Sequence, residues 1–191
     1  VLVRLFLGVS VAAPLSRGLM IQTPHGYIRA AEREDAPALA RLYDPEYPRA
    51  ALLDAKREPI MPTEDEVREL LSRKEVQQGV LYAVEDTAGV VCGFCSVRGV
   101  NPEAGFGETS LLFLADATYE TPLAEDALGF VLERAFERQR LRKLLANGLD
   151  GETALKQFLL GHGFESSGVQ RNALYSLGQW HNLEVFTRFA G

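Results

Sequence analysis

The chain contains few of the residues from which disulfide scaffolds and metal sites are built. Its 191 residues include two cysteines and three histidines. Two cysteines are too few for a disulfide framework, so a hydrophobic core must hold the fold together. Basic residues are outnumbered, with 20 Lys and Arg against 26 Asp and Glu and a net charge of -6. Because nucleic-acid binding requires clustered cations, this balance argues against a nucleic-acid partner.

Long apolar runs are also missing. Only residues 5–15 form an extended apolar segment, and they are too short to span a bilayer, so we expect no membrane partner. The first 19 residues allow three interpretations. Arg4 ahead of this segment, with small residues after it, fits a short secretory signal. The stretch also fits an upstream extension with the start at Met20, or an arm that packs on the domain or on a second copy. The remaining sequence favours a cytoplasmic protein.

The composition is that of a globular domain, with 47% hydrophobic and 24% charged residues. The length suits one domain over residues 20–191, with residues 1–19 as an extension or arm. Helical spacing of apolar residues predicts helices over 32–44, 63–71, 122–138 and 152–160. Strand patterns occur over 26–31, 79–85, 90–97, 106–114, 144–147, 164–169, 173–177 and 183–189. Residues 49–62 look irregular. This order predicts a single α/β domain with a mixed sheet.

Four short strings carry a resemblance to a known family. Residues 26–36 (GYIRAAEREDA) match its opening strand and helix, and 126–136 (DALGFVLERAF) match the helix after its cofactor loop. Residues 163–168 (GFESSG) and 178–184 (GQWHNLE) match its last strands. Over residues 25–190 the chain therefore resembles the GNAT N-acetyltransferase superfamily, in particular its ribosomal-protein-alanine and phosphinothricin acetyltransferase branch. The resemblance implies a mixed, largely antiparallel central sheet flanked by helices.

The resemblance also implies an activity, the transfer of an acetyl group from acetyl-CoA to the primary amine of a small molecule or a protein N-terminus. Such enzymes position a neutral amine against the thioester and remove its proton with a general base. Glu108 stands where the family often places this base, and strand alternation puts it on the same face as Ser110 and Leu112. A solvated strand residue is the alternative. The tyrosine that some family members use as general acid would fall at Phe158 or Leu159, and neither can donate a proton. Tyr175 could take this role if its strand faces the cleft.

Several residues would bind the co-substrate if the resemblance holds. Leu112, Phe113 and Leu114 would pair with the pantetheine arm, and Phe158 would lie beside it. The diphosphate would meet the start of the next helix, where amides and the helix dipole favour anions, at Thr121, Leu123, Ala124 and Glu125. The strands that contain Leu112 and Leu144 should be parallel neighbours that splay apart and leave a slot.

The loop before this helix departs from the family pattern. Tyr119 replaces the leading Arg or Gln, and Pro122 replaces the central Gly and removes an N–H donor. The carboxylates of Glu120 and Glu125 would repel a diphosphate. We therefore expect weak binding of acetyl-CoA. The alternative to an enzyme is a catalytically inactive GNAT-fold binding or interaction module.

Two further features have a structural explanation. Cys92 and Cys95 form a CxxC motif inside a strand, where positions three apart point to opposite faces, so we favour a structural role over redox or zinc chemistry and expect no metal site. The basic residues of 134–143 suit a helix C-terminus, or attract the adenosine 3′-phosphate of the co-substrate. Residues 5–15 and 183–189 carry more apolar sequence than one sheet needs, which predicts a homodimer.

Overall fold

The computed structural model describes residues 20–43, 62–72, 81–176 and 178–191. The expectations for residues 1–19, and for all but Pro62 of the irregular segment 49–62, lie outside this part of the chain. Eight strands form one sheet in the order β1-β2-β3-β4-β5-β6-β8-β7. Only β5 and β6 pair in parallel; the other neighbours are antiparallel. The strands are β1 Met20–Thr23, β2 Gly26–Ala30, β3 Leu81–Asp86, β4 Val91–Asn101, β5 Phe106–Phe113, β6 Lys143–Leu149, β7 Glu165–Ser176 and β8 Gln179–Phe189. The mixed, largely antiparallel sheet is confirmed.

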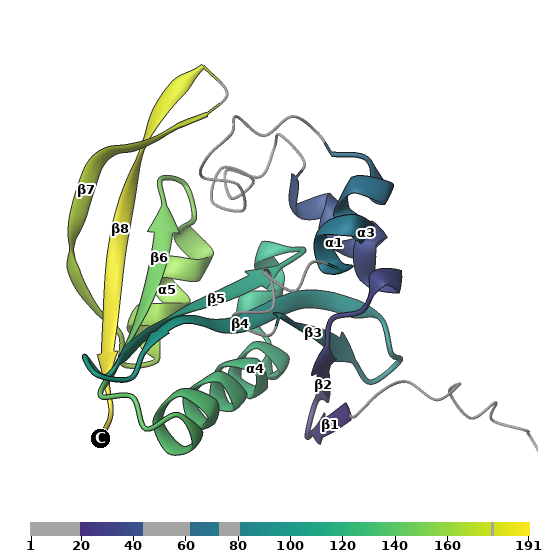
Figure 1. The fold of residues 1–191 in the computed structure, drawn as a ribbon, viewed down its shortest axis with the longest axis horizontal. Helices are drawn as coiled ribbons and strands as arrows, with labels where there is room; N and C mark the ends of the chain where they lie inside the picture. Colours follow the sequence, from purple (N-terminus) through teal and green to yellow (C-terminus); the bar gives the residue numbers. More distant parts are fainter. Residues whose placement is uncertain (1–19, 44–61, 73–80, 177) are drawn as a thin grey trace, which may run out of the picture.

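Helices cover both faces of the sheet (Figure 1). The short 3-10 turns η1 (Arg33–Asp35) and η2 (Arg41–Tyr43) flank α1 (Ala36–Ala40). Together with α3 (Glu64–Ser72), α1 and η2 form one core cluster against β3, β4 and β5. On the other face, α4 (Pro122–Leu132) and α5 (Thr153–Gly161) form a second cluster. No helix in the described part of the chain is long and apolar enough to cross a membrane.

Four elements differ from the prediction. The four residues of strand β1 are too few to show alternation, so the sequence does not predict it. The predicted helix 32–44 is α-helical only over Ala36–Ala40, between two 3-10 turns. The predicted strands 164–169 and 173–177 are one strand, β7, whose register against β8 shifts between Gln170 and Leu174 where Asn172 has a positive φ of 50°. The predicted helix 122–138 ends as an α-helix at Leu132 and continues as a π-helix, η5 (Glu133–Arg138).

A capping box begins α3, where the Thr63 amide donates to the Glu66 carboxylate at 2.7 Å.

The hairpin of β7 and β8 carries several exposed apolar side chains, namely Val169, Tyr175, Trp180 and Phe189. Tyr175 and Trp180 lie opposite each other, with ring centroids 5.3 Å apart. The homodimer expected from this apolar sequence stays a prediction.

A buried charge network joins β2, β3 and η1. The guanidinium of Arg29 donates two bonds to Asp35, two to Glu85 and one to the Ala30 carbonyl, at 2.7–3.1 Å, so all five of its N–H groups are used. The three side chains are 6%, 5% and 1% exposed. The paired carboxylates raise the pKa of Arg29 further above its ordinary value, the hydrogen bonds to Asp35 being the largest cause. This network fixes the start of the α1 segment to the sheet.

We predict that Arg29→Met destabilises the fold by about 3–5 kcal/mol, because it leaves two buried carboxylates without their cation. Urea unfolding at pH 7 measures the loss. The control is Arg138→Met, which removes an ion pair with Glu133 between side chains that are 72% and 48% exposed and should cost less than about 1 kcal/mol. Equal losses in the two variants would contradict this account.

A bulge in β4 places the two cysteines on the same side of the sheet. Val84 pairs with Gly93 and Glu85 with Val91, so Cys92 is an extra residue in β4. The extra residue breaks the alternation, and both Cys92 and Cys95 contact the core cluster under α4. The expectation that they point to opposite faces is therefore wrong. Both thiols are free. Burial raises the pKa of Cys95 to about 12 and is the largest cause of the raised pKa of Cys92.

We predict that neither thiol is rapidly alkylated in the native protein at pH 8, because the thiolate is the reactive form and burial disfavours it. Half-buried Cys92 should react slowly with iodoacetamide, and fully buried Cys95 only after denaturation. Peptide mass spectrometry distinguishes the two sites. Native Cys92→Ala should take up no label. Fast labelling of Cys95 in the native protein would show that its strand is not packed as described.

Candidate functional site

The parallel pairing of β5 with β6 stops partway along both strands. It runs from Phe106 opposite Lys143 to Thr109 opposite Ala146. Beyond that point β5 stays paired with β4, and β6 stays paired with β8. The strands that contain Leu112 and Leu144 are thus parallel neighbours that separate at one end, as predicted.

A cleft of about 620 Å³, including the part open to solvent, lies at this separation. One set of lining residues belongs to the face of α1 and α3: Leu81, Ser96, Arg98, Ser110 and Leu112. Another belongs to the face of α4 and α5: Leu111, Ala146, Leu155 and Leu159. Thr109 and Asn147 lie between them, at the end of the pairing. The cleft is therefore lined from both faces of the sheet, and its α4 and α5 side is formed by buried residues of the core cluster.

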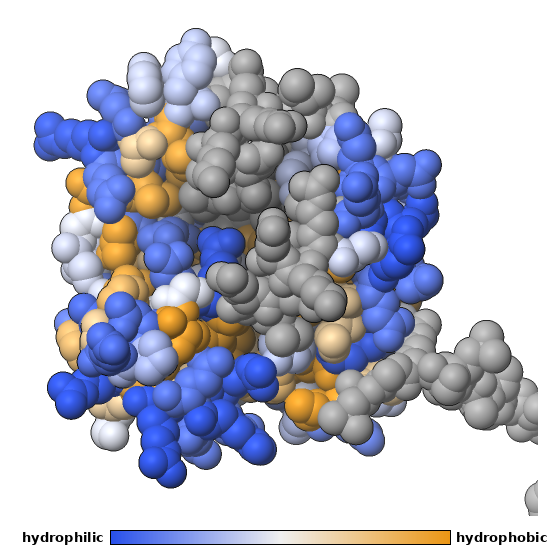
Figure 2. All heavy atoms as spheres, in the orientation of Figure 1, coloured by the Kyte–Doolittle hydropathy of each residue, from blue (hydrophilic) through white to orange (hydrophobic). Residues whose placement is uncertain are grey.

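On the α1 and α3 face, the floor of the cleft changes from apolar to charged across three cross-strand rows. Ala83, Phe94 and Leu112 form a buried apolar row. The next row is Leu81, Ser96 and Ser110, and the third is Arg98 opposite Glu108. Figure 2 shows hydrophilic and apolar residues meeting in the centre of this side of the molecule.

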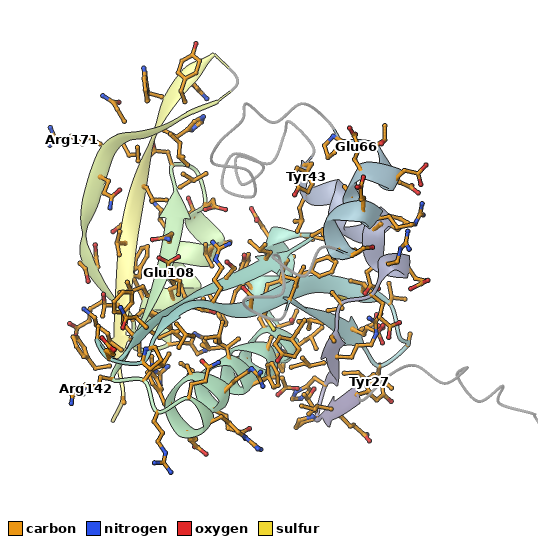
Figure 3. The ribbon with its side chains drawn as sticks, viewed as in Figure 1. Tyr27, Tyr43, Glu66, Glu108, Arg142 and Arg171 are labelled. Atoms are coloured by element: carbon orange, nitrogen blue, oxygen red, sulfur yellow. The ribbon has the colours of Figure 1, made fainter. Side chains whose placement is uncertain are left out.

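Glu108 lies on the segment of β5 that is still paired with β6, opposite Leu145 (Figure 3). Strand alternation places it on the face of Ser110 and Leu112, as expected. Its side chain is partly exposed and stands opposite Arg98, which lines the cleft, but Glu108 itself is not among the lining residues. A water molecule would be needed to connect it to a reaction in the gap.

Three aromatic side chains, Phe113, Tyr119 and Phe158, form a wedge beside the separation of the strands. Tyr119 comes from η4 (Asp116–Glu120), and its ring centroid is 5.0 Å from that of Phe113 and 5.7 Å from that of Phe158. Its hydroxyl donates to the Leu111 carbonyl at 2.8 Å. The Leu112 carbonyl lies against Gly93 of β4, so the preceding carbonyl points to the opposite edge, where β6 diverges. The Tyr119 hydroxyl thus bonds a backbone carbonyl that faces the slot.

The start of α4 offers fewer amides than a regular helix. Pro122 has no N–H, and the Ala124 amide donates to the Thr121 carbonyl at 3.0 Å. The Glu125 amide is the fourth after the N-cap Thr121 and donates within the helix, so among the described residues of this turn only the Leu123 amide is left for an anion.

Histidines lie beside the two acidic residues at the start of α4. The Oε1 atom of Glu125 is 3.7 Å from Nε2 of His162. The carboxylate of Asp126 bonds the backbone amide of His25 at 2.9 Å and its ring Nδ1 at 3.1 Å. The hydroxyl of Thr121, the N-cap, is directed away from the helix and donates to the Thr118 carbonyl at 2.7 Å.

The predicted site residues fall into two groups. Leu112 lines the cleft, and Glu108 neighbours it. Phe113, Leu114 and Phe158 are buried in the core clusters, and the Leu114 amide donates to the Cys92 carbonyl rather than facing the slot. Tyr175 does not come to the cleft: it is 54% exposed on the outermost strand, with β8 between it and β6.

Sequence analysis missed the polar side chains of the cleft, namely Ser96, Arg98, Thr109 and Asn147, and assigned no role to Ser110. Ser96 and Arg98 share a face with Glu108 only through the β4–β5 register, which no local pattern reveals. In the described part of the chain, no group of three His, Cys, Asp or Glu side chains is arranged to hold a metal ion.

Comparison with known proteins agrees with this architecture. The family model for the acetyltransferase (GNAT) domain matches residues 28–183. A structure described as a probable acetyltransferase is 20% identical, with a TM-score of 0.73 over 90% of this chain and 97% of that one. The ribosomal-protein-alanine N-acetyltransferase of Brucella melitensis is 21% identical, with a TM-score of 0.64 over 85% and 99%.

A structure assigned as a phosphinothricin N-acetyltransferase is 20% identical, with a TM-score of 0.63 over 86% of this chain and 98% of that one. Identities this low establish a shared fold. No curated protein matches the chain.

Proposed function

The chain belongs to the GNAT acetyltransferase family, and we propose that it transfers an acetyl group from acetyl-CoA to a primary amine. The observation that supports this most is the cleft where β5 and β6 separate, because residues from both faces of the sheet line it. One face would receive the thioester and the other the amine. Holding the two together supplies much of the rate enhancement of such a reaction.

The reaction requires the loss of one proton. The amine nitrogen attacks the thioester carbonyl, a C–N bond forms, the C–S bond breaks, and CoA leaves as the thiol. We assign Glu108 as the general base that accepts the proton of the attacking amine through a water, since it stands opposite the cleft residue Arg98 without lining the cleft itself. The proton then returns to the leaving thiolate through solvent.

The co-substrate would lie along Leu112 and place its diphosphate at the start of α4, where the Leu123 amide is the donor left. One charge-assisted N–H bond would contribute about 1.5–3 kcal/mol. The carboxylates of Glu120 and Glu125 oppose this, each by roughly 3 kcal/mol at about 6 Å and an effective dielectric near 20. The repulsion is at least as large as this gain, so binding should be weak, with a Kd in the high micromolar range. This loop, with the Tyr119 wedge, is what favours the second candidate, a GNAT-fold binding module without transferase activity.

We predict that Glu108→Gln lowers kcat/KM by about 10²- to 10⁴-fold, the usual contribution of a general base, without changing the affinity for CoA. Mass spectrometry of acetylated products from a panel of primary amines measures the rate. The matched control is Glu137→Gln, the same change at an exposed position of η5. An unchanged rate in Glu108→Gln would exclude Glu108 as the base.

We also predict that Pro122→Gly together with Glu125→Thr tightens CoA binding at least tenfold, or about 1.4 kcal/mol. The first change restores a donor and the second removes a like charge. Calorimetry on the wild type, Pro122→Gly alone and the double variant separates the two contributions. Sub-micromolar binding by the wild type would contradict this account of the loop. Absence of binding in all three proteins would leave only the binding module.

A further inference from the structure

We propose that the acceptor is a small amine that also carries a carboxylate, such as a free amino acid, and that Arg98 binds this carboxylate. The inference rests on the proposed acetyl transfer and names the substrate class for the same cleft. It starts from the side chains on the α1 and α3 face. Among the described residues that line the cleft, Arg98 is the one with a cationic side chain.

The guanidinium of Arg98 is available to a ligand. Its side chain is exposed, and among the described residues it has no ion pair and no side-chain hydrogen bond. Arg29, by contrast, uses all five N–H groups within the core, and Arg138 pairs with Glu133. An arginine with unused donors beside a cleft suits a carboxylate, which its planar fork binds with two parallel bonds.

Glu108 completes the complementarity to an amino acid. It stands directly opposite Arg98 on the neighbouring strand, and side chains at such positions have Cβ atoms about 5 Å apart. The ammonium and carboxylate of an α-amino acid are bonded to the same carbon, so one small molecule can contact both side chains of this row. Glu108 would lie on the side of the ammonium whose proton it removes through a water, while Arg98 faces the carboxylate. The charged row alone already matches both ends of a zwitterion.

The adjacent row supports the same orientation. Ser96 and Ser110 are the next pair along β4 and β5, on the side of the strand separation. Their hydroxyls line the cleft between the charged row and the apolar row of Phe94 and Leu112. They can donate to the second oxygen of the carboxylate or to the forming amide. A polyamine would instead place cations against Arg98, which like charges disfavour.

The test compares acceptors that differ only in the acid group. Wild-type protein is given free amino acids, the corresponding amino-acid amides and spermidine, and kcat/KM is measured for each. Free amino acids should exceed their amides by about 10- to 100-fold, the range of a charge-assisted interaction. Arg98→Met should remove this preference by lowering the rate with acids while changing the rate with amides less than about twofold. Arg98→Lys should restore part of it.

Arg142→Met is the control, because Arg142 is an exposed arginine just before β6 (Figure 3) and is not among the residues that line the cleft. It should change neither rate. Amides or spermidine that react as well as amino acids would overturn the proposal, as would an equal loss for both classes in Arg98→Met.

Calorimetric titration of the protein with the same amino acids separates this inference from the proposed function. If no acceptor is acetylated but amino acids bind the wild type and not Arg98→Met, the ligand class stands and the transferase fails. If no acceptor is acetylated and no amino acid binds, both are wrong.

Discussion

The cleft exists because the pairing of β5 with β6 ends after Thr109. Beyond that point a side chain uses an acceptor of β5: the Tyr119 hydroxyl bonds the Leu111 carbonyl. The rings of Phe113 and Phe158 pack against Tyr119. Had β5 and β6 remained paired to their ends, Ser110 and Asn147 would face each other in a closed sheet. The separation instead leaves a cleft lined by residues from both faces.

The second constraint lies at the other end of the sheet. The Arg29 network fixes η1 to β2 and β3, and so sets where α1 and α3 cover the face on which the acceptor would bind. A buried ion network of this kind adds little net stability relative to apolar packing, yet removing one member is costly. Its effect here is on position: Leu81 and Leu112, which line the cleft, also pack in the core cluster of α1 and α3.

Local patterns in the sequence locate the helical segments, the central strands and the face of Glu108, because each depends on residues within a few positions of one another. They do not show where the helical segments change to 3-10 turns or to a π-helix. The separated strands followed from the family resemblance. Features that depend on register could not be predicted. The extra residue Cys92 breaks the alternation of β4. Strand β7 continues through the register shift near Asn172, where the sequence pattern predicts two separate strands. Arg98 and Ser96 meet Glu108 and Ser110 only across strands, and nothing local indicates that Tyr119 bonds Leu111.

The central claim is that the separation of β5 and β6 is where the thioester binds. Amide hydrogen exchange with and without acetyl-CoA tests it most directly. The account predicts added protection in residues 110–113 of β5, 147–149 of β6 and the first turn of α4, with no change in the β7–β8 hairpin. Protection confined to the hairpin or to β1 and β2, or none at saturating acetyl-CoA, would contradict it.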